Sequence, residues 1–263
     1  MPLYIVEKGN QKGQTIVFIH GGGMSGWMWK KQWEAFQDFH CLIPDLPDHG
    51  NSITEGNIDI NDSAERIAAL IRQRANNGRA HVVGHSLGGK IIVELLSRYP
   101  EVIDHAVVGS ALFRPMPLLN LSMNMPFYKL SVWMLKNKAF LEMQARQFKF
   151  PDQTYIEDFK KEATATTPEM LDRIFFQLNK FVKLPAGLDK AQVPTLVLAG
   201  NKEPRAMRLS AADIAQAIPN AKAYYIQGAL HNYPWVQHEA FNYAIRAWLD
   251  GKPIDHPEIG AIP

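Results

Sequence analysis

The residues best suited to chemistry lie in Gly84-His85-Ser86-Leu87-Gly88, which forms a Gly-x-Ser-x-Gly pattern. The pattern follows the apolar run His81–Val83 and precedes Lys90–Leu96, which has helical character. A serine between a strand and a helix is typical of a tight turn, in which larger side chains at the two glycine positions would clash. Such a strained backbone costs about 1–3 kcal/mol and persists only where its surroundings enforce it. The pattern predicts Ser86 as a nucleophile at a helix N-terminus, whose positive end favours developing negative charge.

The same stretch also matches most of a phosphate-binding loop, from Gly84 to Gly89-Lys90. A phosphate-binding loop requires Ser or Thr at the next position, where the hydroxyl binds magnesium. Ile91 occupies that position, so the sequence disfavours a nucleotide site.

A serine hydroxyl needs a general base, and His231 is the candidate. Of the nine histidines, it is the one at the carboxyl end of a late strand-like run, Ala223–Ile226. We expect His20 and His85 to orient the backbone instead. His81 lies four residues before His85, but not on a helix and without an acidic partner, so no metal site is expected.

The base needs a carboxylate that fixes its tautomer and stabilises its cation. Glu203 follows the strand-like run Thr195–Ala199 and is the nearest carboxylate to its end. It therefore becomes the candidate acid, although it could also be a surface charge beside Lys202 and Arg205. Asp213 is the alternative, within a predicted helix.

A tetrahedral intermediate needs backbone donors, each worth about 3–4 kcal/mol. One predicted donor is the N–H of Leu87, directly after the nucleophile. The other is expected in His20-Gly21-Gly22-Gly23, where small residues allow close approach of the backbone. Gly22 is the first candidate and Gly23 the second.

These residues must be positioned by strands that are buried on both faces, as in a parallel sheet. Apolar, often β-branched runs alternate with helical patterns, which predicts an α/β, mostly parallel doubly wound sheet with sites at the carboxyl ends of its strands. The predicted strands are Thr15–Ile19, Cys41–Pro44, Ala80–Val83, Ala106–Val108, Thr195–Ala199 and Ala223–Ile226, and the clearest helices are Asp62–Asn76, Ser210–Ile218 and Glu239–Leu249.

The alternation breaks between residues 113 and 188, where no clear strand is predicted. We expect this segment to be an inserted helical cap, or lid, on a core formed by residues 1–112 and 189–263. A separate helical domain is the alternative interpretation. The proline-rich stretch Gly251–Pro263 is predicted to be an extended surface tail.

The composition is that of an ordinary globular protein, with 46% hydrophobic and 21% charged residues. The net charge is only +2, and the basic residues are scattered among acidic ones. This pattern argues against nucleic acid and anionic membranes as partners. Cys41 is the single cysteine, so the fold needs no oxidising compartment. Since neither a signal peptide nor a transmembrane run is apparent, we predict a cytoplasmic location.

Together these features resemble the α/β-hydrolase family, specifically its capped serine hydrolase and esterase branch. The resemblance implies an eight-stranded, mostly parallel sheet and a Ser–acid–His triad in this chain order. Two departures stand out: Glu203 replaces the usual Asp, and Asp48 replaces a Gly, which bears on backbone shape. The resemblance rests on His20-Gly21, Trp29, Trp33, Asp45–Ser52, the Ser86 turn, Gly200–Glu203 and His231.

The expected activity is hydrolysis of a small-to-medium apolar carboxylic ester through an acyl-enzyme, with no cofactor. The same triad also allows carbon–carbon bond hydrolysis, amide or thioester hydrolysis, acyl transfer or hydroxynitrile cleavage, since fold and triad do not fix the substrate. A small-molecule receptor with little turnover is the non-catalytic alternative. The sequence does not specify an oligomeric state. The apolar preference rests on Leu118, Leu119, Leu121, Met123, Met125, Phe127, Tyr128, Val132, Trp133 and Met134.

Overall fold

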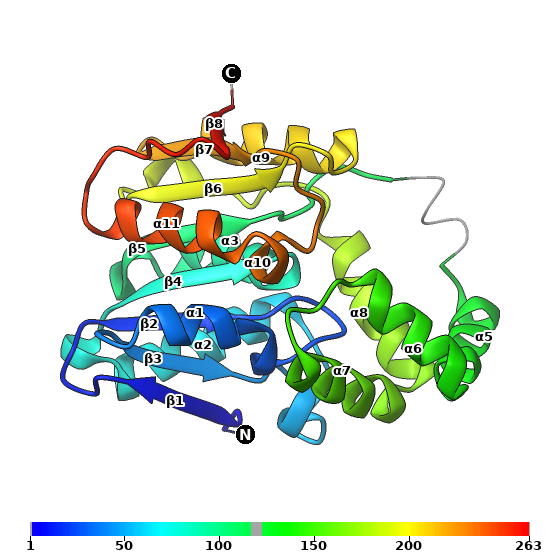
Figure 1. Cartoon of the computed structure of the whole chain (residues 1–263). Helices are drawn as coiled ribbons and strands as arrows, with labels where there is room; N and C mark the ends of the chain where they lie inside the picture. The colour runs from blue at the N-terminus through cyan, green and yellow to red at the C-terminus, as the bar shows by residue number, and fades with distance from the viewer. Residues whose placement is uncertain (1, 117–122, 263) are drawn as a thin grey trace.

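The computed structural model describes residues 2–116 and 123–262. Its centre is one eight-stranded sheet in the order β1-β3-β2-β4-β5-β6-β7-β8 (Figure 1). β1 and β8 run antiparallel to their neighbours and the other pairs are parallel, which confirms the predicted fold class. The strands are β1 Ile5–Gly9, β2 Thr15–Ile19, β3 His40–Pro44, β4 Ala80–His85, β5 Ile103–Gly109, β6 Thr195–Gly200, β7 Ala221–Ile226 and β8 Ile259–Ala261.

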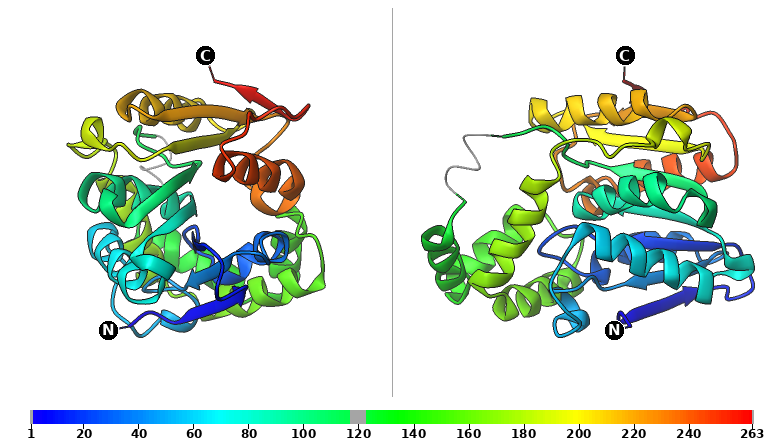
Figure 2. Two further views of the ribbon diagram at one scale, coloured as in Figure 1. Left: turned by 90° about the vertical axis from the view of Figure 1, so that its left-hand side faces the viewer. Right: turned by 180° about the vertical axis from the view of Figure 1, so that it is seen from behind.

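Helices cover both faces of the sheet (Figures 1 and 2). On β2, Val17 and Ile19 pack into one hydrophobic cluster, and Ile16 and Phe18 pack into the other. All four side chains are fully buried, as the apolar run predicts for a central strand. One cluster includes α2 (Ile60–Arg74), α3 (Leu87–Arg98) and α9 (Arg205–Ala217), and the other includes the 3-10 turn η1 (Gly26–Trp29), α1 (Lys30–Ala35), α10 (Tyr233–Val236) and α11 (His238–Leu249).

Three elements differ from the sequence predictions. Helix α2 begins after Asp59, whose side chain accepts hydrogen bonds from the backbone N–H groups of Asn61 and Asp62. The edge strand β1 was not predicted, because its residues lack a fully apolar pattern. The predicted tail was wrong for residues 259–261, which pair with β7 as strand β8. An edge strand has unpaired backbone groups, and β8 satisfies those of β7.

In the part of the chain that the structure describes, four α-helices lie between β5 and β6 in sequence, beside the carboxyl ends of the parallel strands (Figure 1). They are α5 (Met125–Leu135), α6 (Lys138–Gln147), α7 (Gln153–Ala165) and α8 (Pro168–Lys180). In the described part of residues 113–188, no strand interrupts these helices. Leu118, Leu119 and Leu121 lie outside the described residues, and the division into a core domain and a cap stays a prediction. Each helix is preceded by an N-cap residue whose side chain accepts a hydrogen bond from a backbone N–H group of the first turn. In chain order these residues are Asn124, Asn137, Asp152 and Thr167.

A salt bridge joins α8 to the loop after β3. Arg173 contacts Asp48 through two nitrogens, at 2.8 and 2.6 Å. The Asp48 side chain is only 3% exposed, and its backbone has a φ of 65°. The positive φ accounts for glycine as the usual residue here. The aspartate therefore does more than the sequence suggested, because it also fixes α8 to the core.

No helix in the described chain combines the length and the apolar character needed to cross a membrane.

Asp48→Ala and Asp48→Gly should both destabilise the protein, because each leaves Arg173 without its carboxylate. Asp48→Ala should cost about 1 kcal/mol more, since alanine at positive φ is strained and glycine is not. Urea unfolding at pH 7 measures this difference. Asn77, with a φ of 63° and no salt bridge, provides the matched pair of substitutions and should show only the difference between alanine and glycine. Equal unfolding free energies for the two Asp48 variants would contradict the strain argument.

Candidate active site

Ser86 occupies a sharp turn between β4 and α3. Its backbone has φ 56° and ψ −111°, and its N–H donates to the Gly109 carbonyl at 2.8 Å. A Cβ at Gly84 would lie 2.6 Å from the Gly88 backbone, and one at Gly88 would lie 2.1 Å from the Ile19 carbonyl oxygen. Both glycines are therefore required sterically, as the spacing predicted. The turn presents a partly exposed Ser86 at the start of α3.

His231 and Glu203 are paired on the neighbouring loops. The distance from His231 Nδ1 to Glu203 Oε1 is 2.6 Å. The Glu203 side chain is 1% exposed, whereas that of His231 is 46% exposed. The other carboxylate oxygen accepts hydrogen bonds from Ser110 Oγ and from the Gly200 N–H, both at 2.7 Å. A buried, fully bonded carboxylate thus orients an accessible imidazole and places the ring proton on Nδ1.

Ser110 and Tyr233 belong to this network but were not identified from the sequence. The Tyr233 hydroxyl lies 3.0 Å from Ser110 Oγ and is fully buried. Ser110 directly follows β5, so its place at a strand's carboxyl end was the available signal. The alternative acid, Asp213, lies in α9 and is bound by Arg114 at 2.6 and 2.8 Å.

The paired histidine lies beside the Ser86 turn. The ring centroids of His231 and His85 are 4.5 Å apart, and His85 immediately precedes Ser86. Burial holds the pKa of His85 well below its usual value, and His231 lowers it further. His85 is therefore a neutral packing partner, not a competing base. The fold thus gathers Ser86, His231 and Glu203 at one edge of the sheet.

The glycine loop after β2 lies against the same turn. A Cβ at Gly21 would lie 3.5 Å from Ser86 Cβ, and one at Gly22 would lie 3.9 Å from Leu87 Cβ. The loop and the N-terminus of α3 therefore approach each other beside Ser86, as two oxyanion donors must.

The hydrogen bonds of the loop distinguish its two candidate donors. The Gly23 N–H already donates to His49 Nε2 at 3.1 Å. Among the described residues, the N–H groups of Gly22 and Leu87 have no protein acceptor. Gly22 and Leu87 thus fit the oxyanion role, and Gly23 fits it less well.

Two neutral histidines hold this loop. His20 donates from Nδ1 to the Gly21 carbonyl and accepts the Leu46 N–H at Nε2, both at 2.8 Å. His49 donates from Nδ1 to the Pro47 carbonyl at 2.8 Å. Burial lowers the pKa of His20 to about 4, and burial together with the adjacent His20 lowers the pKa of His49 to about 3. Protonation would turn each accepting Nε2 into a donor facing another donor.

In His49→Gln, the stability deficit relative to the wild type should shrink as pH falls. An unfolded histidine binds a proton below its usual pKa of 6.5, whereas folded His49 stays neutral down to about pH 3. Native stability from this group is therefore lost between about pH 6.5 and 3, and glutamine removes that dependence. Urea unfolding at pH 7, 5.5 and 4 measures the deficit. His256→Gln, which replaces a partly exposed histidine near the C-terminus, is the control. A stability deficit that stays constant or grows as pH falls would contradict the conclusion that folded His49 is neutral and stabilises the glycine loop.

Within residues 2–116 and 123–262, no three His, Cys, Asp or Glu side chains are grouped in a way that could hold a metal ion. The polar groups around Ser86 are instead an imidazole, a buried carboxylate and two backbone N–H groups.

These features agree with the comparison to known families. A sequence profile described as the alpha/beta hydrolase family matches residues 16–244. The chain therefore belongs to the alpha/beta hydrolase family, and it is a hydrolase.

Several relatives extend this comparison. An "AB hydrolase superfamily protein" of Gibberella zeae is 42% identical over 109 residues, which span 40% of this chain and 39% of that protein. "Lipase 1" of Psychrobacter immobilis is 24% identical over 86% of this chain and 73% of its own length. Among solved structures, a "Lipase-esterase related protein" from Clostridium acetobutylicum has a TM-score of 0.73 and 18% identity, over 94% of this chain and 100% of that one.

Proposed function

We propose that this hydrolase cleaves small-to-medium apolar carboxylic esters, with Ser86 as nucleophile, His231 as base and Glu203 as acid. The observation that carries the proposal is the 2.6 Å contact between His231 and the buried Glu203, beside a serine held at a φ of 56°. The similarity to Lipase 1 of Psychrobacter immobilis supports ester bonds as the target. The cytoplasmic location and the lid formed by residues 113–188 remain part of the proposal.

Acylation begins when Ser86 Oγ attacks the ester carbonyl carbon and its proton moves to His231 Nε2. The carbonyl oxygen becomes an oxyanion that receives the N–H groups of Gly22 and Leu87. The imidazolium keeps its Nδ1–H on Glu203. When the tetrahedral intermediate collapses, the ester C–O bond breaks, and His231 gives its proton to the departing alcohol.

Deacylation repeats these steps with water. His231 takes a proton from water as the oxygen attacks the acyl carbon, and the same N–H groups receive the oxyanion. The bond to Ser86 Oγ then breaks, and His231 returns its proton to that oxygen. The products are a carboxylic acid and the free enzyme.

Glutamate can replace aspartate here because two hydrogen bonds hold the carboxylate of its longer side chain in place. Ser110 Oγ and the Gly200 N–H hold one carboxylate oxygen, which leaves the other directed at His231. Charge-assisted hydrogen bonds of this kind restrict the side chain to one conformation. Glu203 therefore positions the imidazole as an aspartate would.

The preference for neutral esters rests on the apolar surface of α5 and α8. Phe127, Leu130, Trp133 and Phe176 expose 40, 53, 71 and 60% of their surface, while Tyr128 and Val132 of α5 are buried. An apolar surface of this extent favours ligands without charge.

A fluorophosphonate should label the wild-type protein once, at Ser86, as detected by intact-protein and peptide mass spectrometry. Turnover of p-nitrophenyl butyrate should be lost in Ser86→Ala and His231→Ala, because both remove a reacting group. Glu203→Gln should lower kcat about 10⁴-fold, since the amide favours the wrong imidazole tautomer.

Asp213→Asn is the matched control for the acid and should keep kcat within about twofold of the wild type. A folded wild-type protein that gives no adduct would overturn the proposal. A larger loss in Asp213→Asn than in Glu203→Gln would overturn the assignment of the acid.

A further inference from the structure

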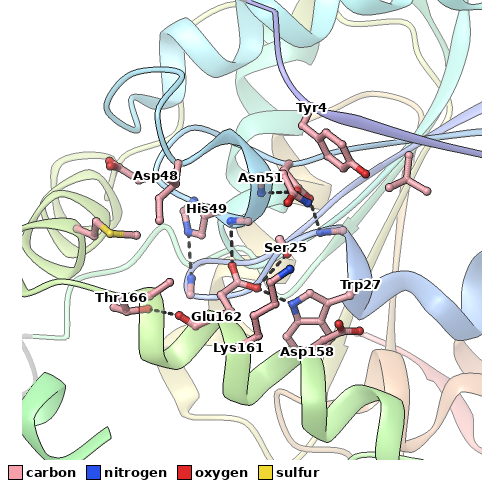
Figure 3. Close-up of a pocket in the computed structure, with 18 of the residues that line it drawn as sticks. Tyr4, Ser25, Trp27, Asp48, His49, Asn51, Asp158, Lys161, Glu162 and Thr166 are labelled. Atoms are coloured by element: carbon pink, nitrogen blue, oxygen red, sulfur yellow. Dashed lines mark hydrogen bonds between the residues drawn. The ribbon is translucent and has the colours of Figure 1, made fainter. Parts of the chain in front are cut away.

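A cavity of about 240 Å³ lies between α7, α8 and the loop after β3, beside the glycine loop (Figure 3). Neither Ser86 nor His231 is among its lining residues. Most of the lining surface is apolar, and the aromatic and aliphatic side chains of the lining include Tyr4, Trp27, Trp33, Ile53, Met170 and Ile174.

Ile174 and Gly23 connect this cavity to the oxyanion site. Both line the cavity. A Cβ at Gly22 would lie 2.9 Å from Ile174 Cγ2 and 3.8 Å from Leu87 Cδ2, so Ile174 packs directly on the loop that carries the proposed donor. Ile174 is 4% exposed and contacts both the cavity and the oxyanion loop, so its side chain forms the part of the cavity wall that lies beside Gly22.

One acidic group of the cavity lining, Glu162, is already satisfied by protein donors. Glu162 reaches from α7 to the core segments (Figure 3). It accepts hydrogen bonds from Ser25 Oγ at 2.9 Å, Trp27 Nε1 at 2.5 Å and the Gly50 N–H at 3.2 Å. Its oxygens are thus occupied by protein donors and are not offered to a ligand.

The three aspartates of the lining are satisfied in the same way. Asp45 accepts the backbone N–H groups of Gly26 and Asn51, at 2.8 and 2.9 Å. Asp48 is held by Arg173, and Asp158 lies 2.6 Å from Lys30 Nζ. Lys161 is exposed to solvent. The surface left for a ligand inside the cavity is therefore that of the aromatic and aliphatic side chains, which favours an alkyl or aryl group.

We propose that this cavity binds the acyl chain of the substrate ester, and that Ile174 sets the chain length that reaches it. The inference rests on the proposed function. When the N–H groups of Gly22 and Leu87 bind the carbonyl oxygen, the first atoms of the acyl chain lie beside Gly22. Ile174, which lines the cavity, packs against Gly22 at this place. The Arg173–Asp48 salt bridge, one residue from Ile174, holds that wall in place.

The test compares kcat/KM for p-nitrophenyl octanoate with that for p-nitrophenyl acetate. Ala165→Trp adds bulk at an exposed lining position of α7, and Thr164→Trp adds it at the adjacent exposed position that does not line the cavity. Ile174→Ala removes the wall, and Ile156→Ala on α7 is its matched control, away from the cavity.

The octanoate-to-acetate ratio should fall at least about tenfold in Ala165→Trp and rise about tenfold in Ile174→Ala, as expected for loss or gain of several methylene contacts. Thr164→Trp and Ile156→Ala should leave the ratio within about twofold of the wild type. An unchanged ratio in Ala165→Trp would overturn the inference. So would a chain-length dependence found for the alcohol of alkyl acetates instead of the acyl group.

A binding measurement separates this inference from the proposed function. Calorimetry with octanamide on Ser86→Ala should show binding that is lost on adding Ala165→Trp and kept on adding Thr164→Trp. If wild-type protein hydrolyses no ester but this pattern holds, the proposed function fails, and the cavity is an alkyl-chain site that does not serve ester hydrolysis. If esters are hydrolysed and Ala165→Trp affects neither the ratio nor octanamide binding, the cavity assignment fails alone.

Discussion

The site depends on a close backbone contact at the centre of the molecule. Where α3 leaves β4, a Cβ on Gly88 would lie 2.1 Å from the carbonyl oxygen of Ile19 on the neighbouring strand β2. This contact lets the helix start directly above the sheet and forces the positive φ of Ser86. The carboxyl ends of β2, β4, β5, β6 and β7 lie side by side along one edge of the sheet, so the glycine loop, Ser110, Glu203 and His231 lie near the Ser86 turn.

Polar groups around this point are arranged so that few of them can change partners. His20 and His49 each donate from one ring nitrogen and accept with the other, which fixes the neutral form and the shape of the glycine loop. Glu203 is held by Ser110 and the Gly200 N–H. Preorganised dipoles of this kind need no rearrangement when charge develops, which is the main source of electrostatic stabilisation.

The helices between β5 and β6 are attached to the same region. Arg173 binds Asp48, and Glu162 binds Ser25, Trp27 and Gly50. These contacts hold α7 and α8 against the oxyanion loop and enclose the apolar cavity beside it. A glycine at position 48 would retain the turn but lose the salt bridge, so this departure from the family pattern links α8 to the loop beside the site.

The sequence by itself determined the class of fold, the glycine spacing around Ser86, and His231 and Glu203 as candidates, because strand runs, tight turns and strand ends are local patterns. Tertiary structure decided the features that join distant segments. Strand β8 forms because the free edge of β7 offers unpaired backbone groups to the C-terminal segment. Ser110 joins the acid because β5 lies beside β6. Gly22 fits better than Gly23 as a donor because His49 occupies the Gly23 N–H. Such contacts depend on chain packing, which no local pattern of residues encodes.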